Sequence, residues 1–307
     1  MEMRQLEIFV QVADSSGFLA AAEQLHLSQS TVSAGVAALE QELQTQLIRR
    51  TTRTFALTEA GQKLYAYAAD ILSLQRRARR ELAGKSGQTL QLGASSVPGQ
   101  CLLPPLLAAC REKKPQLRFE VLHGDSEDII DMVAAGRLDA GFVGTRTAAA
   151  CVFVPLAEDE LVLVTPAAPA FRRLQQRGAP LAELLRAPFL LRDERSGTMQ
   201  ETLRFFASAG IDPAQLNVAA RIADAETLRL CVAQGMGVSV LSAGTVQELA
   251  QQGRVLTFSL GAHALRRSLY LVYRQRRFQP GAAEEFLAFA RAFFGAAEAD
   301  AAAPAAK

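Results

Sequence analysis

Three runs of apolar residues at helical spacing begin the chain, and only a very short gap separates the second run from the third. Residues 4–13 form the first run and residues 18–26 the second. The third begins after Ser28, a residue type suited to capping a helix N-terminus. Its apolar positions recur every three or four residues, at Val32, Val36, Leu39 and Leu43. Two short helices joined by so tight a turn predict a helix-turn-helix.

A helix-turn-helix places the first residues of its second helix against base edges in the DNA major groove. In this chain those residues are polar: Gln29, Ser30, Thr31 and Ser33. Glutamine can pair with adenine through two hydrogen bonds, and hydroxyls can bond to bases or phosphates. We therefore predict a DNA-binding face here. A capped, solvated helix face is the alternative, because the same geometry occurs in proteins that bind no nucleic acid.

Residues 47–58 alternate in polarity around a polar turn, which predicts a β-hairpin or wing. Arg49, Arg50 and Arg53 lie in this stretch. Arginines on a wing contact phosphates or the minor groove and make DNA affinity strongly salt-dependent. These three arginines complete the predicted DNA-binding residues.

Motifs across the first 61 residues resemble the signature of LysR-type transcriptional regulators. They include residues 21–29, Val32-Ser33, Leu39-Glu40 and residues 57–61. The chain departs from the usual pattern in three places: Ser30 replaces Pro, Ala34 replaces a frequent Arg, and Gln44 replaces Gly. The last departure predicts a non-glycine residue in the left-handed conformation at a helix end, at a cost of about 1 kcal/mol.

Residues 58–85 lack proline and carry a narrow apolar stripe, which predicts one long helix. Such a helix cannot bury its stripe alone, so it pairs with another copy of the chain or packs on its own domain. The LysR-type resemblance implies pairing through this helix, as a homodimer or homotetramer. Residues 84–88 are typical of a hinge.

Strands and helices alternate beyond residue 88, in one set over residues 89–143 and a second over residues 189–241. Such alternation predicts parallel sheets with crossover helices. Leu161–Thr165 and Leu269–Tyr273 are typical of strands that pass between two lobes.

The resemblance implies a complete architecture for the chain. It is an α/β protein with an N-terminal winged helix-turn-helix, a long linker helix and a C-terminal two-lobed effector domain of the periplasmic-binding-protein type. We expect the DNA-binding domain at residues 1–58, the linker at 59–88 and the effector domain at 89–307. Lobe I then comprises about 89–164 plus 267–295, and lobe II about 165–266.

Ligands of such sheets bind at the carboxyl ends of strands, where helix N-termini present backbone donors. Residues 93–99 and 192–198 both have a strand end leading into a helix through hydroxyl residues, with arginines near the second. We predict a small-anion site that includes Ser95, Ser96, Ser196 and Thr198. The alternative is that Ser96 and Ser196 only cap helices.

Several of these segments also resemble the CysB-like and selenium-metabolism-associated branch of the LysR-type regulators: residues 94–99, 102–107, 124–127, 191–192 and 196–198. This resemblance implies a sulfur oxyanion or a related small anion as the effector. It adds Thr145, Glu226 and Ser242 to the predicted effector site. Arg195 stands where the branch often has glycine, which adds positive charge.

The sequence argues against an enzyme and against a secreted solute-binding protein. His26, His123 and His263 belong to no evident triad or metal cluster, and there is no nucleophile elbow or phosphate-binding loop. We expect no cofactor, no metal and no membrane partner. The first residues lack the apolar stretch of an export signal, so we expect a cytoplasmic protein.

The expected partners are double-stranded DNA at a promoter or operator, a small anionic effector and a second copy of the chain, and the resemblance adds RNA polymerase. The four cysteines are widely spaced, which argues against zinc and against a disulfide framework. A redox switch between Cys101 and Cys110 is the alternative to four small buried residues.

Overall fold

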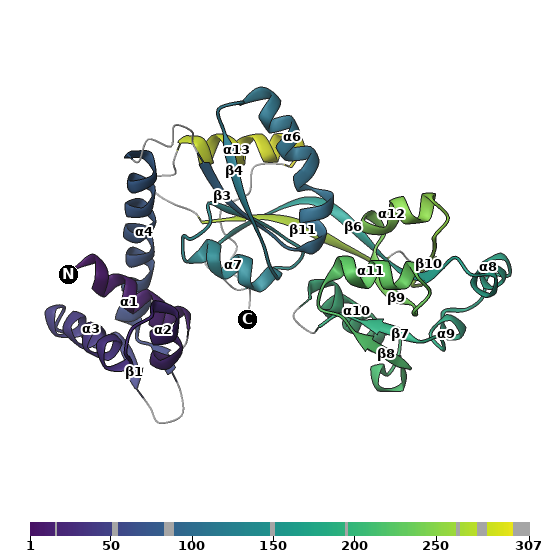
Figure 1. The fold of residues 1–307 in the computed structure, drawn as a ribbon, viewed down its shortest axis with the longest axis horizontal. Helices are drawn as coiled ribbons and strands as arrows, with labels where there is room; N and C mark the ends of the chain where they lie inside the picture. The colour runs from purple at the N-terminus through teal and green to yellow at the C-terminus, as the bar shows by residue number, and fades with distance from the viewer. Residues whose placement is uncertain are drawn as a thin grey trace. The chain divides into compact units, whose positions relative to one another are not determined.

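The structure is a computed structural model that describes residues 1–15, 17–50, 55–82, 89–147, 151–193, 196–261, 265–274 and 281–296. The chain divides into two units, residues 1–87 and most of residues 88–307 (Figure 1). Among the described residues, no helix is both long and apolar enough to cross a bilayer.

The first unit begins with three helices around one apolar core: α1 (Met3–Asp14), α2 (Phe18–Leu25) and α3 (Gln29–Glu42). The hydroxyl of Ser28 accepts the backbone N–H of Thr31 at 3.1 Å and so caps α3. His26 ends α2 in the left-handed conformation, with φ of 54°, which gives the short turn between the two helices. The predicted helix-turn-helix is confirmed.

A wing follows, in which β1 (Ile48–Arg50) pairs antiparallel with β2 (Phe55–Leu57). Thr58 then joins the wing to the long helix α4 (Glu59–Leu82): its backbone N–H donates to the Leu47 carbonyl, and its hydroxyl accepts the Gly61 N–H at 2.9 Å. A Cβ on Gly61 would lie 2.1 Å from the Leu47 carbonyl oxygen, so only glycine fits there. The predicted hairpin and linker helix are therefore both present.

One seven-stranded sheet organises the second unit, in the order β10-β6-β11-β5-β3-β4, with β9 also paired to β6. Strands β3 (Thr89–Ala94), β4 (Arg118–His123) and β5 (Ala140–Val143) are parallel. The long strand β6 (Val152–Pro166) pairs antiparallel with β11 (Leu265–Tyr273), and its later residues pair with β9 (Ser239–Ser242) and β10 (Val255–Ser259). Strands β6 and β11 therefore join two halves of this unit (Figure 1).

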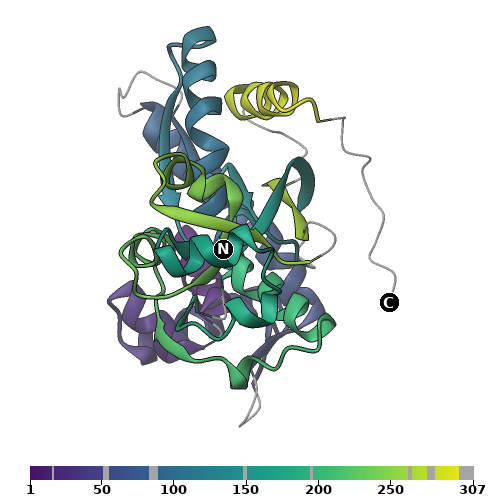
Figure 2. The same ribbon diagram turned by 90° about the vertical axis from the view of Figure 1, so that its right-hand side faces the viewer.

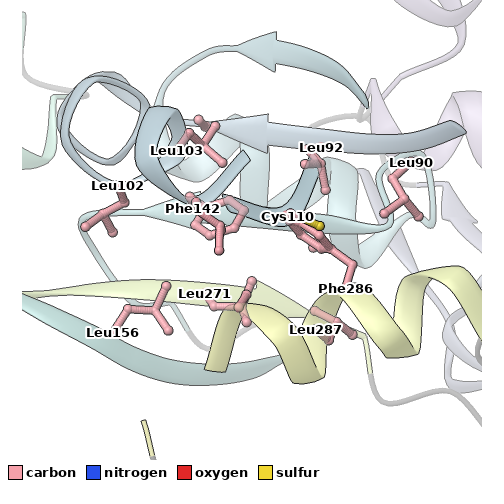
Figure 3. Close-up of a cluster of buried hydrophobic side chains, with 14 of the residues drawn as sticks. Leu90, Leu92, Leu102, Leu103, Cys110, Phe142, Leu156, Leu271, Phe286 and Leu287 are labelled. Carbon is pink, nitrogen blue, oxygen red and sulfur yellow. The ribbon is translucent and has the colours of Figure 1, made fainter. Parts of the chain in front are cut away.

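The first half of the second unit packs its helices on the sheet. These are α5 (Ser96–Cys101), α6 (Leu103–Lys113), α7 (Ser126–Ala134) and α13 (Gly281–Phe293). Phe286 and Leu287 of α13 face Phe142 and Leu271 of the sheet (Figure 3), and the rings of Phe142 and Phe286 lie 6.4 Å apart. Helix α13, in yellow, lies beside α6 in both ribbon views (Figures 1 and 2).

The second half has two smaller apolar clusters. Its parallel pair of short strands is β7 (Phe189–Leu191) and β8 (Val218–Arg221). Its helices are α8 (Pro169–Gln176), α9 (Leu181–Leu184), α10 (Gly197–Ser208), α11 (Ala225–Ala233) and α12 (Ala243–Gln251), with a short 3-10 turn at Pro213–Gln215.

One sequence-based boundary differs from the structure. The helix expected from about Gly99 is two helices, α5 and α6, separated at Leu102. Pro104 and Pro105 occupy the first turn of α6, where proline favours a new helix start. The strands expected to pass between the lobes at residues 161–165 and 269–273 are present, as parts of β6 and β11.

Candidate functional sites

The exposed start of α3 is the candidate DNA-reading surface. Gln29, Ser30 and Thr31 are exposed, whereas Ser33 is half-buried. The Ser28 hydroxyl lies 2.8 Å from the Ser30 hydroxyl and 2.7 Å from that of Thr31, so both take part in the helix cap. Gln29 makes no side-chain hydrogen bond within the described part of the chain, which leaves its amide available to a base.

The predicted wing arginines are described only in part. Arg49 is exposed on β1, where it is paired in register with Ala56. The backbone of Arg50 ends β1. Arg53 lies outside the described residues.

A small polar pocket with a cavity volume of about 20 Å³ lies between the two halves of the second unit. Ser95 and Ser96 reach it from the carboxyl end of β3, Arg192 from the end of β7, and residues 196–198 from the start of α10. Further polar lining comes from Asp125, Ser126 and Arg267. Strand ends and a helix N-terminus thus converge on one space, as the sequence predicted.

Arg267 is a buried cation with its charge already balanced. Its Nε donates to Oδ2 of Asp159 at 2.9 Å, and its Nη2 donates to the Thr198 hydroxyl at 3.1 Å. The Ser242 hydroxyl donates to the other oxygen of Asp159. This chain of contacts links β6, β9, β11 and the start of α10 beside the pocket.

Arg192 is a second buried cation, and its ion pair with a described residue is looser than that of Arg267. Its side chain is 7% exposed, and it makes no hydrogen bond with any described residue. Its nearest acidic oxygen is Oδ1 of Asp125, at 3.9 Å from Nη2, beyond hydrogen-bond distance. A buried guanidinium in this state is costly unless an acceptor joins it.

Two neighbouring hydroxyls, those of Ser96 and Ser196, also make no hydrogen bond with a described residue. Ser196 is the N-cap residue of α10, but its side chain accepts no capping hydrogen bond. Neither Ser196 nor Ser96 makes a side-chain hydrogen bond with a described residue, so the structure gives no support to a purely capping role. The first backbone N–H groups of α10 have no partner within the helix and lie at the positive end of its dipole.

The remaining predicted effector residues lie at different distances from this pocket. Ser242 lines an adjoining hollow and is bonded to Asp159. Thr145 lies beside the start of α10, since a Cβ on Gly197 would come 2.8 Å from its Cγ2. Glu226 does not line the pocket, and its carboxylate is paired with Arg229 one turn along α11.

Sequence reasoning left Arg267 out and did not place Arg192 among the site residues. A signal for Arg267 existed: it alternates with Leu269 and Leu271, which places it on the apolar face of its strand. Such a residue is buried only with a partner. Its partner, Asp159, lies 108 positions away in the sequence.

Two family models cover most of the chain. Residues 3–62 match the bacterial regulatory helix-turn-helix protein, lysR family, and residues 83–295 match the LysR substrate binding domain. This chain belongs to the LysR family. It is therefore a DNA-binding transcriptional regulator with an effector-binding domain, and the LysR-family proteins to which it is similar are named as regulators rather than enzymes.

Relatives of this LysR-family chain match over nearly their full length. The uncharacterized HTH-type transcriptional regulator YeiE of Escherichia coli K12 is 30% identical, over 93% of this chain and 95% of the relative. A probable RuBisCO transcriptional regulator of Cyanidioschyzon merolae is also 30% identical, over 92% and 95%.

Solved structures agree on the fold. A full-length OxyR variant from Pseudomonas aeruginosa is 25% identical with a TM-score of 0.61, and 95% of each chain is covered. CbnR, a LysR family transcriptional regulator, is 24% identical with a TM-score of 0.54, over 95% of this chain and 100% of that chain. The predicted architecture of helix-turn-helix and two-lobed domain is confirmed.

Proposed function

We propose that this LysR-family regulator responds to a small anion bound in the pocket between the two lobes. Four hydroxyls donate hydrogen bonds to the anion, and the guanidinium of Arg192 supplies the positive charge that balances it. The hydroxyls are those of Ser95, Ser96, Ser196 and Thr198. Thr145, Glu226 and Ser242 belong to the wider predicted site. Glu226 is the weakest of these, because its charge is already paired with Arg229.

The main support for this proposal is the buried guanidinium of Arg192, whose Nε has no hydrogen-bond acceptor and whose ion pair with Asp125 is long, at 3.9 Å. Burial removes its hydration, yet no described residue accepts its hydrogen bonds. A bound oxyanion would supply both the charge and the acceptors. The cavity volume of the pocket, about 20 Å³, lies far below the range typical of drug-sized ligand sites, which favours a small ion.

A sulfur oxyanion is the proposed chemical class, and its support is the resemblance of residues 94–99 and 196–198 to the CysB-like branch. The relatives reported above do not identify that branch. The proposal of a sulfur oxyanion over other small oxyanions is therefore tested by comparing their binding in one ligand panel.

The chain would act on promoter or operator DNA as a homodimer or homotetramer. Support for DNA reading comes from the exposed start of α3 and from Arg49 on the wing. Support for pairing comes from α4, whose Tyr67 and Leu74 are 69% and 63% exposed. Contact with RNA polymerase stays a prediction of the family resemblance.

Thermal unfolding of the full-length protein tests the effector proposal. The panel contains sulfate, sulfite, thiosulfate, phosphate, nitrate, carboxylates and amino acids. A ligand at about 100 times its dissociation constant adds about 2.7 kcal/mol, which raises the melting temperature by several degrees. We expect one small oxyanion to do so.

The decisive comparison uses two variants. Arg192→Met should abolish the shift, because it removes the buried guanidinium that would bind the anion. Arg204→Met removes an exposed arginine of α10, which pairs with Glu201, and should leave the shift intact. Stabilisation that survives Arg192→Met, or that comes only from uncharged compounds, would refute the anion site.

A further inference from the structure

We infer that the effector is an oxyanion that keeps a proton at neutral pH, and that Asp125 accepts the hydrogen bond from that proton. This inference rests on the proposed anion site and narrows its ligand class. It comes from a second unusual feature of the pocket, a carboxylate on the wall of an anion site.

Asp125 lines the pocket directly before α7, and its side chain is 28% exposed. Its carboxylate makes no hydrogen bond with a described residue. Its backbone carbonyl accepts the Ile129 N–H at 3.0 Å. The next residue, Ser126, is buried, and its hydroxyl accepts the Gly144 N–H at 3.2 Å. These two bonds hold the turn that presents the carboxylate to the pocket.

Asp125 forms a long ion pair with Arg192 but keeps its hydrogen-bond acceptors free of any described residue. Arg267 is balanced by Asp159, so Asp125 is not needed to neutralise it. Arg192 is 3.9 Å away, close enough for attraction but too far for a hydrogen bond. A small oxyanion in the pocket would therefore contact hydrogen-bond donors on Arg192, Ser96 and the start of α10. It would also contact one acceptor, the Asp125 carboxylate.

An ionised carboxylate can only accept hydrogen bonds. Sulfate at neutral pH can also only accept, so it would face Asp125 with like charge and no hydrogen bond. A hydrogen oxyanion of similar shape has one O–H to donate. Sites built around a ligand's hydrogen-bonding group reject analogues that lack it by large factors, because a polar group of the protein is then left unpaired.

Hydrogen phosphate and hydrogen sulfite share this chemistry, whereas sulfate and thiosulfate lack the proton. The test is isothermal titration of the full-length protein with phosphate, sulfite, sulfate and thiosulfate at one neutral pH. Three proteins are compared: the unchanged chain, Asp125→Asn, and Glu127→Gln. Glu127 is an exposed carboxylate in the first turn of α7, so its variant removes the same charge nearby but outside the pocket.

We expect the unchanged chain to bind phosphate or sulfite at least about tenfold more tightly than sulfate. The tighter binder of phosphate and sulfite shows whether the proton-bearing anion is a phosphorus or a sulfur oxyanion. Asp125→Asn should reduce that preference by about tenfold, because an amide can donate to a sulfate oxygen. Glu127→Gln should keep it.

Sulfate or thiosulfate binding as tightly as the proton-bearing anions to the unchanged chain would overturn the inference, and this comparison needs no variant. An unaltered preference in a folded Asp125→Asn protein would also overturn it. Neither result would contradict the proposed anion site itself. If no anion bound the unchanged chain, the proposed function would fail first.

Discussion

Arg267 and Asp159 face each other across the antiparallel ladder of β11 and β6, and the arginine Nε donates to the carboxylate at 2.9 Å. Their side chains are only 6% and 5% exposed. These two strands connect the lobes, so a change in lobe closure would act on the strands that this ion pair joins. The Ser242 and Thr198 hydroxyls satisfy further atoms of the pair.

Breaking this pair should destabilise the protein strongly. Arg267→Met leaves Asp159 buried without its counter-ion, and we expect the free energy of unfolding to fall by about 3–5 kcal/mol in guanidinium titrations. Arg266→Met is the neighbouring control: its exposed pair with Glu158 contributes about 1 kcal/mol or less. Equal losses in the two variants would show that the buried pair has no special role.

The wing and recognition helix should differ in their effects on DNA binding. Arg49→Ala should weaken binding to all DNA sequences and lower the salt slope by about one, because it removes one phosphate contact. Gln29→Ala should chiefly blur site preference, since glutamine reads a base edge. Fluorescence anisotropy against specific and scrambled duplexes at several salt concentrations separates the two effects. If both variants bound like the parent, the DNA surface would be misassigned.

Gln44 should be a site of stabilisation. It follows α3 with φ of 48°, a conformation in which glycine is favoured. Gln44→Gly is expected to raise the free energy of unfolding by up to about 1 kcal/mol, measured on the transition of the helix-turn-helix unit. A loss of stability there would mean that the Gln44 side chain makes a contact worth more than its backbone strain.

Three of the four cysteines should resist alkylation in the folded protein. Burial raises the pKa of the Cys151 thiol to about 11, and burial also raises the pKa of Cys101 and Cys110. These three thiols should therefore react slowly with iodoacetamide in native protein at pH 8, and rapidly in unfolded protein. Fast native labelling of Cys101 or Cys110 would revive the redox alternative.

The same shift gives a pH dependence of stability. The unfolded thiol of Cys151 ionises above about pH 9 and the folded one only near pH 11. Its contribution to stability is thus complete below pH 9 and is lost as pH rises through this window. Replacing Cys151 with alanine should flatten the pH dependence of the melting temperature between these values.

Local patterns were enough to predict the helix-turn-helix, the wing, the linker helix and the strand ends of the pocket. Ser28 caps α3 as its residue type suggested, and Gln44 adopts the left-handed conformation expected of that position. These features depend on contacts between residues a few positions apart, so the sequence pattern records them directly.

The charged groups of the pocket were harder to predict because they depend on distant partners. Arg267 contacts Asp159 only when β11 pairs with β6. The Glu226 carboxylate forms an ion pair with Arg229 and does not line the pocket. Whether a polar residue is satisfied or left open is a property of the packed fold. Arg192 became a candidate only when its buried Nε proved to have no acceptor.

Control of DNA binding by this pocket can be measured as the DNA affinity of the full-length protein with and without the stabilising oxyanion, on duplexes selected by the protein from random sequence. We predict that the anion changes affinity or footprint length for the unchanged chain. Arg192→Met should bind the same DNA but lose the response. An anion that binds at Arg192 yet leaves DNA binding unaltered, or a response that persists in Arg192→Met, would contradict the claim that this pocket controls the regulator.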